Sequence, residues 1–517
     1  MRSLRHLAAS FFLRKTRMPK IEVLETDPVA CQQEMFEYLI HRARNTAWGK
    51  LHDYANIENI ADFQAKVPVN TYETFFPFIE RVLKGQKYVL WPGKVKWFAK
   101  SSGTTNDRSK FIPMTKEILE DNHFACGKDM LAQYFELRAE ESNAFAGKIL
   151  SIGGSHEISR YNKNARAGDL SAVLIQNMPF TYELSRVPSR KVALMSDWDD
   201  KLEAMAREAA EENVTAIAGV PTWTWLVVSK AMEVKGITSG NLHDLWTNLE
   251  VFFHGGVNFE PYREQFRQLM PAPHMRFMEV YNASEGFFAF QTDLKDRGLQ
   301  LLLSHGIFFE FIPLSDVGKL HPKALTIGEV EVGETYAMLI STVGGLWRYA
   351  IGDTVRFTST YPHKVVVAGR TKHFINAFGE ELMVGNAEAA IAKACAQTGA
   401  TVKDFTAGPL YAQPEHDLLG THEWIIEFDQ RPDDPEQFNR ILDAELQRLN
   451  GDYGAKRAND FAMRFPVIHH APSGTFESWM RQRGKLGGQN KVPRLANHRE
   501  YLEAVLEVMG EKRQETA

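Results

Sequence analysis

A run of hydroxyl side chains with one glycine and a terminal lysine lies at residues 101–110, SSGTTNDRSK. The backbone N–H groups, hydroxyls and ammonium of such a loop can bind the oxygens of a polyphosphate. The candidate ligands are Ser101, Ser102, Gly103, Thr104, Thr105 and Lys110. Because the sequence contains neither GxxxxGKS/T nor GxGxxG, the two common phosphate-binding signatures are excluded. An ordinary solvated turn is the alternative interpretation of this composition.

A second candidate, YNASEG at 281–286, directly follows an apolar run that ends in EVY. The sheets of α/β proteins bind ligands where strands end, and there Glu285 can hold a Mg²⁺ ion whose other ligands are phosphate oxygens. The ring of Tyr281 can stack on a base. The alternative is a helix with Ser284 as its N-cap and Glu285 in its first turn. The local residues favour neither interpretation.

Two further segments carry a charge beside glycine. In WRYAIGD at 347–353, Asp353 is expected in a turn just before the strand-like run DTVRF. Its carboxylate can accept hydrogen bonds from both hydroxyls of a ribose. An Asx turn is the alternative there.

Near the C-terminus, RGKLGGQNKVPR at 483–494 contains Lys485 and Lys491, either of which can neutralise charge that develops in a transition state. A solvated surface loop is the alternative for that segment.

The elements that must position these residues follow from the pattern of apolar runs. Short runs that end on glycine or proline alternate with helical stretches between about residues 147 and 281, which predicts a mixed α/β sheet buried on both faces. The strand runs at 300–370 follow one another closely, so we expect an antiparallel sheet or barrel packed against the α/β part. The predicted fold class is α/β, with a large N-terminal body of mixed α/β sheets plus a β-barrel-like part.

A smaller C-terminal α+β domain is predicted beyond the segment GRTKHFINAFGEEL at 369–382. It contains an alanine-rich helix that ends at Gly399, the strand-like run THEWIIEFDQ, and a helix with Asp434 as N-cap and Pro435 in its first position. We divide the chain into a large domain, residues 1–378, and a small domain, residues 379–517; the resemblance described below implies that the large one binds nucleotide and acyl group and that the small one is mobile.

The composition excludes several classes of protein. The 517 residues carry 60 lysines and arginines against 65 aspartates and glutamates, a formal net charge of −5, so we expect no nucleic acid partner. Cys31, Cys126 and Cys395 form no CxxC pair, which indicates a reducing cytoplasmic location. No run reaches the ~20 apolar residues of a membrane span, so we expect no integral membrane association. The basic residues 1–20 predict a terminal helix, with weak attachment to an anionic surface as the alternative.

Together and in this order, SSGTT at 101–105, YNASE at 281–285 and RYAIGD at 348–353 resemble the ATP-binding motifs of the adenylate-forming superfamily. They are most similar to those of the Gretchen Hagen family of acyl acid amido synthetases, and we expect a bacterial-type member. The resemblance runs from about residue 30 to 500 and adds HGGV at 254–257, which lies where such enzymes line the adenine pocket. The chain departs from the family in lacking a glycine after SSGTT, and in Lys372, which replaces a hinge residue that is acidic in many relatives.

The resemblance implies a role for each candidate residue. The loop at 101–105 and Lys110 bind the phosphates of ATP, and Gly255 and Gly256 line the adenine pocket. The remaining nucleotide contacts are Tyr281, stacked on adenine, Ser284 beside the nucleotide, Glu285 with Mg²⁺, and Asp353 on the ribose. The family's QxKxPR-like loop favours Lys491 over Lys485 as the lysine of adenylation.

The implied reaction uses ATP and Mg²⁺ and has two steps. A carboxylic acid attacks the α-phosphate of ATP and releases pyrophosphate, and an amine, most simply that of an amino acid, then converts the acyl-adenylate to an amide. Val220, Thr222 and Trp223 are candidates for the acyl pocket, and burial in the core is the alternative for the tryptophan. Two other functions stay open: an acyl-CoA or carrier-protein ligase that shares the first step, and an inactive binding or scaffold homologue.

Overall fold

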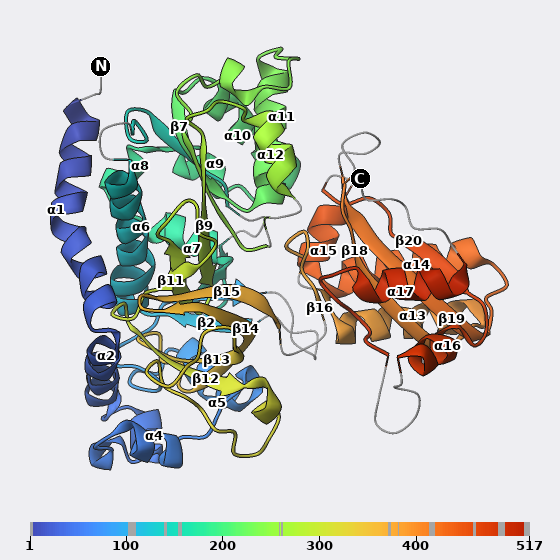
Figure 1. Ribbon diagram of the computed structural model, residues 1–517, viewed down its shortest axis with the longest axis horizontal. Coiled ribbons are helices and arrows are strands. Elements are labelled where there is room, and N and C mark those ends of the chain that lie inside the picture. Colours follow the sequence, from blue (N-terminus) through green and yellow to red (C-terminus); the bar gives the residue numbers. More distant parts are fainter. Residues whose placement is uncertain are drawn as a thin grey trace. The chain divides into compact units, whose positions relative to one another are not determined.

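The computed structural model describes residues 4–101, 110–138, 142–153, 158–257, 259, 262–370, 374–380, 382–412, 419–458, 462–483 and 492–510. These residues group into two compact units, one within residues 1–371 and the other within 372–517 (Figure 1). The predicted functional division at residues 378 and 379 stays a prediction.

A mixed sheet forms the centre of the N-terminal unit. Its parallel strands are β3 (Lys148–Ser151), β6 (Arg186–Val187), β7 (Val214–Gly219), β8 (Val251–Gly255) and β9 (Arg276–Ala283). Its antiparallel strands are β10 (Gly286–Gln291), β11 (Leu299–Leu301), β12 (Ile307–Pro313), β13 (Thr335–Thr342), β14 (Tyr349–Thr360) and β15 (His363–Arg370). Among the described residues the order is β12-β13-β14-β15-β11-β10-β9-β8-β7-β3-β6. The predicted mixed α/β body is therefore confirmed, and its parallel and antiparallel strands share one sheet.

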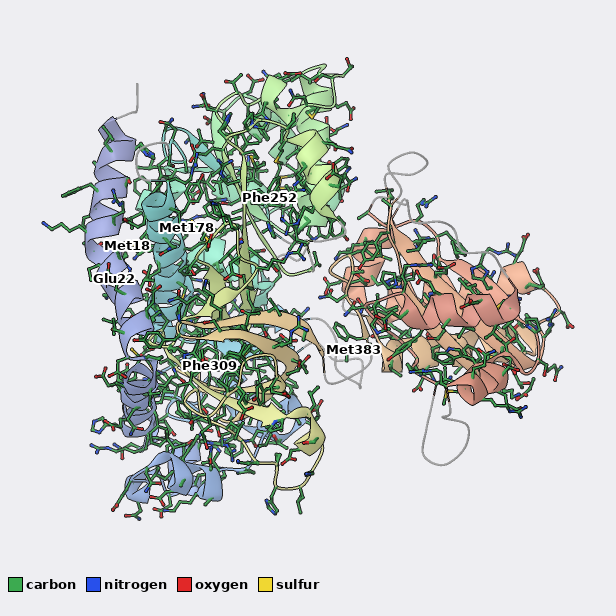
Figure 2. All side chains as sticks on the ribbon, viewed as in Figure 1. Met18, Glu22, Met178, Phe252, Phe309 and Met383 are labelled. Atoms are coloured by element: carbon green, nitrogen blue, oxygen red, sulfur yellow. The ribbon has the colours of Figure 1, made fainter. Side chains whose placement is uncertain are left out.

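Helices cover the parallel strands, as their sequences require. Strand β8 is buried along its whole length, and its Phe252 lies within the packed side chains of this region (Figure 2). A strand buried on both faces needs apolar residues at every position, which explains the continuous apolar runs. The helices of this region are α7 (Leu170–Asn177), α8 (Phe180–Glu183), α9 (Arg190–Ala193), α10 (Trp198–Ala210), α11 (Pro221–Val234), η3 (Leu242–Asp244) and α12 (Arg263–Leu269).

The antiparallel part of the sheet curls strongly. Strands β9 and β14 are separated by three strands, so a flat sheet would place them roughly 19 Å apart. Instead the Tyr281 hydroxyl on β9 donates a hydrogen bond to Asp353 Oδ2 on β14 over 2.7 Å. Gly286 of β10 lies so close to Ile307 of β12 that an added Cβ would be 2.6 Å from the isoleucine Cδ1. The described strands form no hydrogen-bonded ladder that closes this curl, so the β-barrel-like part is an open, curled sheet.

A second sheet in the same unit carries the hydroxyl-rich loop. Its described strands are β2 (Lys110–Met114), β1 (Trp97–Ser101), β5 (Arg166–Gly168) and β4 (Ser159–Arg160), in that order. Helix α5 (Tyr72–Leu83) packs on β2, where the Phe111 amide donates to the Tyr72 hydroxyl over 2.8 Å.

The remaining helices of the N-terminal unit surround these sheets. They are α1 (Leu4–Thr26), α2 (Pro28–Ala43), α3 (Ala47–Leu51), η1 (Tyr54–Asn56), α4 (Ile60–Lys66), η2 (Ile118–His123), α6 (Phe124–Leu137) and η5 (Leu314–Asp316). The basic N-terminal segment is the long helix α1, which lies along α6 (Figure 1). Arg14 and Arg17 of α1 pair with Glu136 and Asp129 of α6. The predicted terminal helix is thus confirmed.

The C-terminal unit has its own core. Its strands are β16 (Phe374–Ile375), β17 (Leu382–Met383), β18 (Thr401–Leu410), β19 (Thr421–Gln430) and β20 (Val467–Ala471). Its helices are α13 (Val384–Thr398), α14 (Pro435–Leu449), α15 (Gly451–Arg457), α16 (Thr475–Gln482) and α17 (Glu500–Met509). Helix α14 begins as predicted, with the Asp434 carboxylate accepting the Gln437 amide over 3.0 Å. Helix α13 ends at Gly399, whose φ of 66° is left-handed, and the predicted α+β character of this part is confirmed.

Candidate nucleotide and acyl site

The hydroxyl-rich segment is the connection of a β-hairpin. Ser101 at the end of β1 lies opposite Lys110 at the start of β2, so the two ends of the loop are held in register by an antiparallel ladder. Ser102, Gly103, Thr104 and Thr105 lie outside the described residues. The structure therefore places Ser101 and Lys110 at the same end of a hairpin, and the roles of the four residues between them stay predictions.

The segment YNASEG forms a tight turn between two strands. Strand β9 runs to Ala283, Ser284 and Glu285 make the turn, and β10 begins at Gly286, which pairs with Ala283. The alternative of a helix beginning at Ser284 is wrong, because the ladder with β10 takes the backbone groups that a helix would need. Glu285 is buried, with 9% of its surface exposed.

Asn122 holds this hairpin in place and was not predicted from the sequence. It is fully buried in the wide π-helical turn η2, and its Oδ1 accepts the Phe287 amide over 2.7 Å. Its Nδ2 donates to the carbonyls of Phe287 and His305 over 3.1 and 2.8 Å. The neighbouring His123 is also buried, and burial lowers its pKa to about 4, so the imidazole is neutral at pH 7. No local signal marks Asn122, because it directly follows the acidic pair Glu120 and Asp121 in a polar stretch of sequence. π-helical turns such as η2 often occur at functional sites.

Two of the predicted nucleotide ligands lie in contact. Tyr281 and Asp353 are buried, with 8% and 7% of their surfaces exposed, and the tyrosine hydroxyl donates to the Asp353 carboxylate over 2.7 Å. The ring of Tyr281 packs against Phe288, with 4.9 Å between the ring centroids. Asp353 was expected in a turn before a strand, and that placement is wrong: it lies inside β14, opposite Arg370 of β15. The extended backbone of β14 holds the carboxylate more rigidly than an Asx turn would.

The segment HGGV brings another pair of candidates together. Gly255 ends β8, and a Cβ there would be 2.5 Å from the Val280 carbonyl, so only glycine allows this backbone approach to β9. Gly256 has a φ of 83°, and an added Cβ would be 3.2 Å from Val220 Cγ2. The candidate adenine-pocket backbone therefore borders the candidate acyl pocket at Val220, the residue that precedes α11.

The other acyl-pocket candidates lie in the first turn of α11. The side chain of Thr222 lies outside the described residues. Trp223 is buried, with 6% of its surface exposed, so its indole is part of the packed interior.

His254, next to Gly255, is buried, and its ring stacks on that of Phe259 with 3.7 Å between the ring centroids. Burial, with a smaller effect of the nearby Arg263 charge, lowers the pKa of His254 to about 3. The His254 imidazole is therefore neutral at pH 7, and the Arg263 guanidinium lies 5.2 Å from the centre of the Phe259 ring.

An ion pair anchors the start of β14, the strand of Asp353. Arg348 has a φ of 42°, and its guanidinium binds both Glu310 oxygens, with Nε to Oε1 and Oε2 at 3.1 and 3.0 Å. Its Nη1 also donates to the carbonyls of Gln64 and Val67 over 3.0 and 2.7 Å. The arginine and glutamate are 4% and 1% exposed. Arg348 thus positions the motif RYAIGD through packing and hydrogen bonds.

We expect Arg348→Met to destabilise the protein by about 3–5 kcal/mol, because it leaves the Glu310 carboxylate buried without its partner. Urea unfolding followed by circular dichroism measures this change. The double variant Glu310→Met/Arg348→Met removes both charges and should recover much of the lost stability. An Arg348→Met protein as stable as the wild type would show that Glu310 is satisfied without the arginine.

The hinge-like segment at 369–382 is described in part, and Lys372 lies outside the described residues. The Glu380 carboxylate accepts hydrogen bonds from the amides of Ala377 and Phe378 over 3.2 and 2.7 Å, and from His422 Nε2 over 2.7 Å. Burial raises the pKa of Glu380, but the hydrogen bond and charge of His422 outweigh it, so the pKa is lowered. The turn between β16 and β17 is therefore built around an ionised carboxylate.

The remaining predictions concern the two C-terminal lysines, the Mg²⁺ ion, the cysteines and membrane association. Lys485 and Lys491 lie outside the described residues, so their roles stay predictions. Within the part of the chain that the structure describes, no three His, Cys, Asp or Glu side chains gather to hold a metal. A Mg²⁺ ion at Glu285 would take most of its ligands from phosphate and water, which is how Mg²⁺ commonly binds beside nucleotides. The three cysteines are free thiols, and no described helix is long and apolar enough to cross a membrane.

Comparison with known proteins covers most of the chain. Indole-3-acetic acid-amido synthetase GH3.4 of Arabidopsis thaliana is 23% identical, over 92% of this chain and 90% of the relative. Jasmonoyl-L-amino acid synthetase JAR4 of Nicotiana attenuata is 22% identical, over 65% of this chain and 68% of the relative.

The fold is shared with solved structures. The structure of AtGH3.15 acyl acid amido synthetase in complex with 2,4-DB matches with a TM-score of 0.62 at 17% identity, over 96% of each chain. A 2-hydroxyisobutyryl-CoA ligase matches with a TM-score of 0.54 at 11% identity, over 95% of this chain and 94% of that one. These likenesses confirm the fold class, because each covers 95% or more of this chain.

The family assignment rests on three consecutive matches along the sequence. Residues 17–275 match the GH3 family N-terminal domain, residues 300–370 the central domain, and residues 385–500 the C-terminal domain. The turn at Ser284 and Glu285 falls between the first two matches, and Asp353 falls inside the second. The chain therefore belongs to the GH3 family.

Proposed function

We propose that this protein is an ATP-dependent acyl acid amido synthetase that joins a carboxylic acid to an amino acid through an acyl-adenylate. The observation that carries the proposal is the buried contact between Tyr281 and Asp353, which brings two nucleotide-binding motifs of a GH3-family chain together over 2.7 Å. The names of the relatives support it, because both the indole-3-acetic acid and the jasmonoyl enzymes are amido synthetases. The acid, the amine and a bacterial-type lineage are finer proposals, and identities of 22–23% to the plant relatives suit a distant branch.

In the proposed site, the hairpin loop at 101–110 binds the phosphates of ATP, and the adenosine lies between the two sheet motifs. Asp353 accepts the ribose hydroxyls, Tyr281 and the Gly255–Gly256 backbone flank the adenine, and Ser284 contacts the nucleotide. Glu285 fits Mg²⁺ because it is a carboxylate on a tight turn; when bound, the ion would neutralise phosphate charge. The buried imidazole of His254, which is neutral at pH 7, suits an uncharged base as neighbour.

The chain's own residues then position the acid for attack on the α-phosphate. Lys110 and the adenylation lysine, Lys491 in preference to Lys485, would offset the negative charge that develops there. Val220 and the first turn of α11 would bind the acyl group. No covalent protein nucleophile is needed, because alignment and charge neutralisation lower the barrier. In the second step the small C-terminal domain would reorient so that the amine attacks the acyl carbonyl. Three free thiols fit a reducing cytoplasm as the location.

An acyl-CoA ligase is the second candidate, favoured by the fold shared with 2-hydroxyisobutyryl-CoA ligase. Pyrophosphate release is measured across a matrix of carboxylic acids and amino acids, with CoA in parallel wells. We expect release that depends on an acid, and an amide product that mass spectrometry identifies only when an amino acid is present. A thioester without any amide would overturn the proposal in favour of the CoA ligase. No acid-dependent pyrophosphate exchange in any well would indicate the inactive binding homologue.

A further inference from the structure

A small cavity lined by basic side chains lies on the four-stranded sheet of the N-terminal unit. It measures about 220 Å³, and its lining residues are Lys96, Arg160, Asn162, Lys163, Asn164, Ala165 and Arg166. Four of these seven residues are cations with exposed side chains, and no acid is among them. Lys94 adds a fifth cation, since its Nζ lies 3.4 Å from Asn164 Oδ1.

The cations of this cavity are not neutralised by the protein. Lys94, Lys96, Arg160, Lys163 and Arg166 form no ion pair among the described residues, in a chain whose net charge is −5. The nearby Glu80 is engaged by Lys84 at 3.0 Å. Like charges at close range repel one another, and a bound anion would remove this repulsion.

The backbone under the cavity is rigidly held. Asn162 Oδ1 accepts the amides of Asn164 and Ala165 over 2.7 and 2.9 Å, and its Nδ2 donates to the Leu83 carbonyl at the end of α5 over 3.0 Å. Asn164 Nδ2 donates to the Lys84 carbonyl over 2.8 Å. Gly85, with φ at 89°, makes room for this contact, because an added Cβ would be 2.6 Å from Asn164 Cγ. The loop is therefore pre-organised.

Two of the cations also lie beside an aromatic ring. The Arg166 guanidinium lies 5.5 Å and the Lys96 ammonium 5.8 Å from the centre of the Trp97 ring. The Arg166 amide donates to the Lys96 carbonyl over 2.9 Å, which joins β5 to the start of β1. A cation held by an aromatic ring loses less side-chain entropy when it binds a ligand, so these two residues are prepared to bind an anion.

The cavity is separate from the proposed nucleotide site. Trp97 begins β1 and Ser101 ends it, so Ser101 and Lys110, the described ends of the hairpin loop, lie about 13 Å along the strand from the Trp97 end that borders the cavity. The lining contains no large apolar side chain, which does not suit an acyl group. Its volume is below the ~300 Å³ of drug-sized ligand pockets, which indicates a small and highly charged ligand.

We propose that this cavity is a binding site for an oligophosphate, either free or carried by a nucleotide, distinct from the ATP site of the proposed reaction. Five cations balance the four to five charges of a tripolyphosphate, whereas a single phosphate would leave most of them unpaired. The two guanidinium groups offer the paired donors that phosphate oxygens accept. Occupation of the site removes the mutual repulsion of the cations and so stabilises the N-terminal unit.

The test is calorimetric titration of the full chain with sodium tripolyphosphate at constant ionic strength. The double variant Lys96→Gln/Arg166→Gln keeps much of each side chain's stem and removes two charges, so we expect at least about tenfold weaker binding at this site. The matched control Lys50→Gln/Arg267→Gln changes two other exposed cations of the same unit and should bind as the wild type does. Circular dichroism verifies that each variant is folded.

The variant Lys110→Gln tests whether tripolyphosphate binds in the cavity or at the hairpin loop. It should leave tripolyphosphate binding in the cavity intact. Unchanged binding in Lys96→Gln/Arg166→Gln, or loss of all binding in Lys110→Gln, would overturn the proposal. The cavity variant should retain acid-dependent pyrophosphate exchange, so failure of this site and failure of the proposed reaction are distinguishable. Titration of the same proteins with ATP shows whether the bound oligophosphate belongs to a nucleotide or is free. Weaker ATP binding in the cavity variant indicates a nucleotide, and unchanged ATP binding indicates a free oligophosphate. Both results support an oligophosphate site.

Discussion

Asp353→Asn is expected to lower kcat/KM for ATP in the adenylation step by about 100-fold while the protein stays folded. The carboxylate accepts the Tyr281 hydroxyl over 2.7 Å inside β14, and the proposed ribose hydroxyls would add two more hydrogen bonds to the same charge. Each hydrogen bond to a charged group contributes about 1.5–3 kcal/mol, and an amide offers one acceptor oxygen in place of two. Acid-dependent exchange of labelled pyrophosphate into ATP measures the loss.

Tyr281→Phe is the matched control for this prediction. It removes the hydroxyl that orients the carboxylate but keeps both the charge and the ring, so we expect about a tenfold loss or less. The double variant should lose little more than Asp353→Asn alone, because the two residues act through one hydrogen bond. Wild-type exchange kinetics in Asp353→Asn would show that the carboxylate does not bind the nucleotide.

Lys491→Ala is expected to lose acyl-adenylate formation by about 100- to 1,000-fold while ATP binding changes little. A lysine that meets charge developing at the α-phosphate stabilises the transition state more than the ground state, and removing one such donor typically has this effect. Pyrophosphate exchange reports adenylation, and equilibrium binding of ATP reports the ground state. The amide-forming step is assayed separately by supplying a pre-formed acyl-adenylate, and we expect it to persist.

Lys485→Ala is the internal control, six residues earlier in the same glycine-containing segment. It should retain adenylation, because the resemblance to the QxKxPR loop places Lys491 at the reactive position. Normal exchange in Lys491→Ala together with loss in Lys485→Ala would transfer the role to Lys485. Normal exchange in both variants would remove this segment from the adenylation step.

The parallel strands and the C-terminal helices could be predicted because their signals are local. Strand β8 is buried on both faces and begins with the apolar run from Val251 to Phe253, and helix α14 carries its own N-cap at Asp434. At Ser284 and Glu285 the sequence left a loop and a helix start equally open, because a serine followed by a glutamate suits both. The strand β10 that follows decided between them by pairing with β9. Asn122 was missed because its hydrogen bonds to Phe287 and His305 join it to segments far away in the sequence, which no local pattern records.

By itself, the sequence determined the order of the motifs and the α/β fold class, because residue types and local periodicity record these directly, and the resemblance of the motifs to a known family indicated the family. The curl of the sheet was decided only in the tertiary structure. Tyr281 and Asp353 are 72 positions apart, on strands with three others between them, and a flat sheet would keep them roughly 19 Å apart. Packing across the inside of the curl, as between Gly286 and Ile307, brings them into hydrogen-bonding contact. No local pattern encodes that contact, because it depends on the shape of the whole sheet.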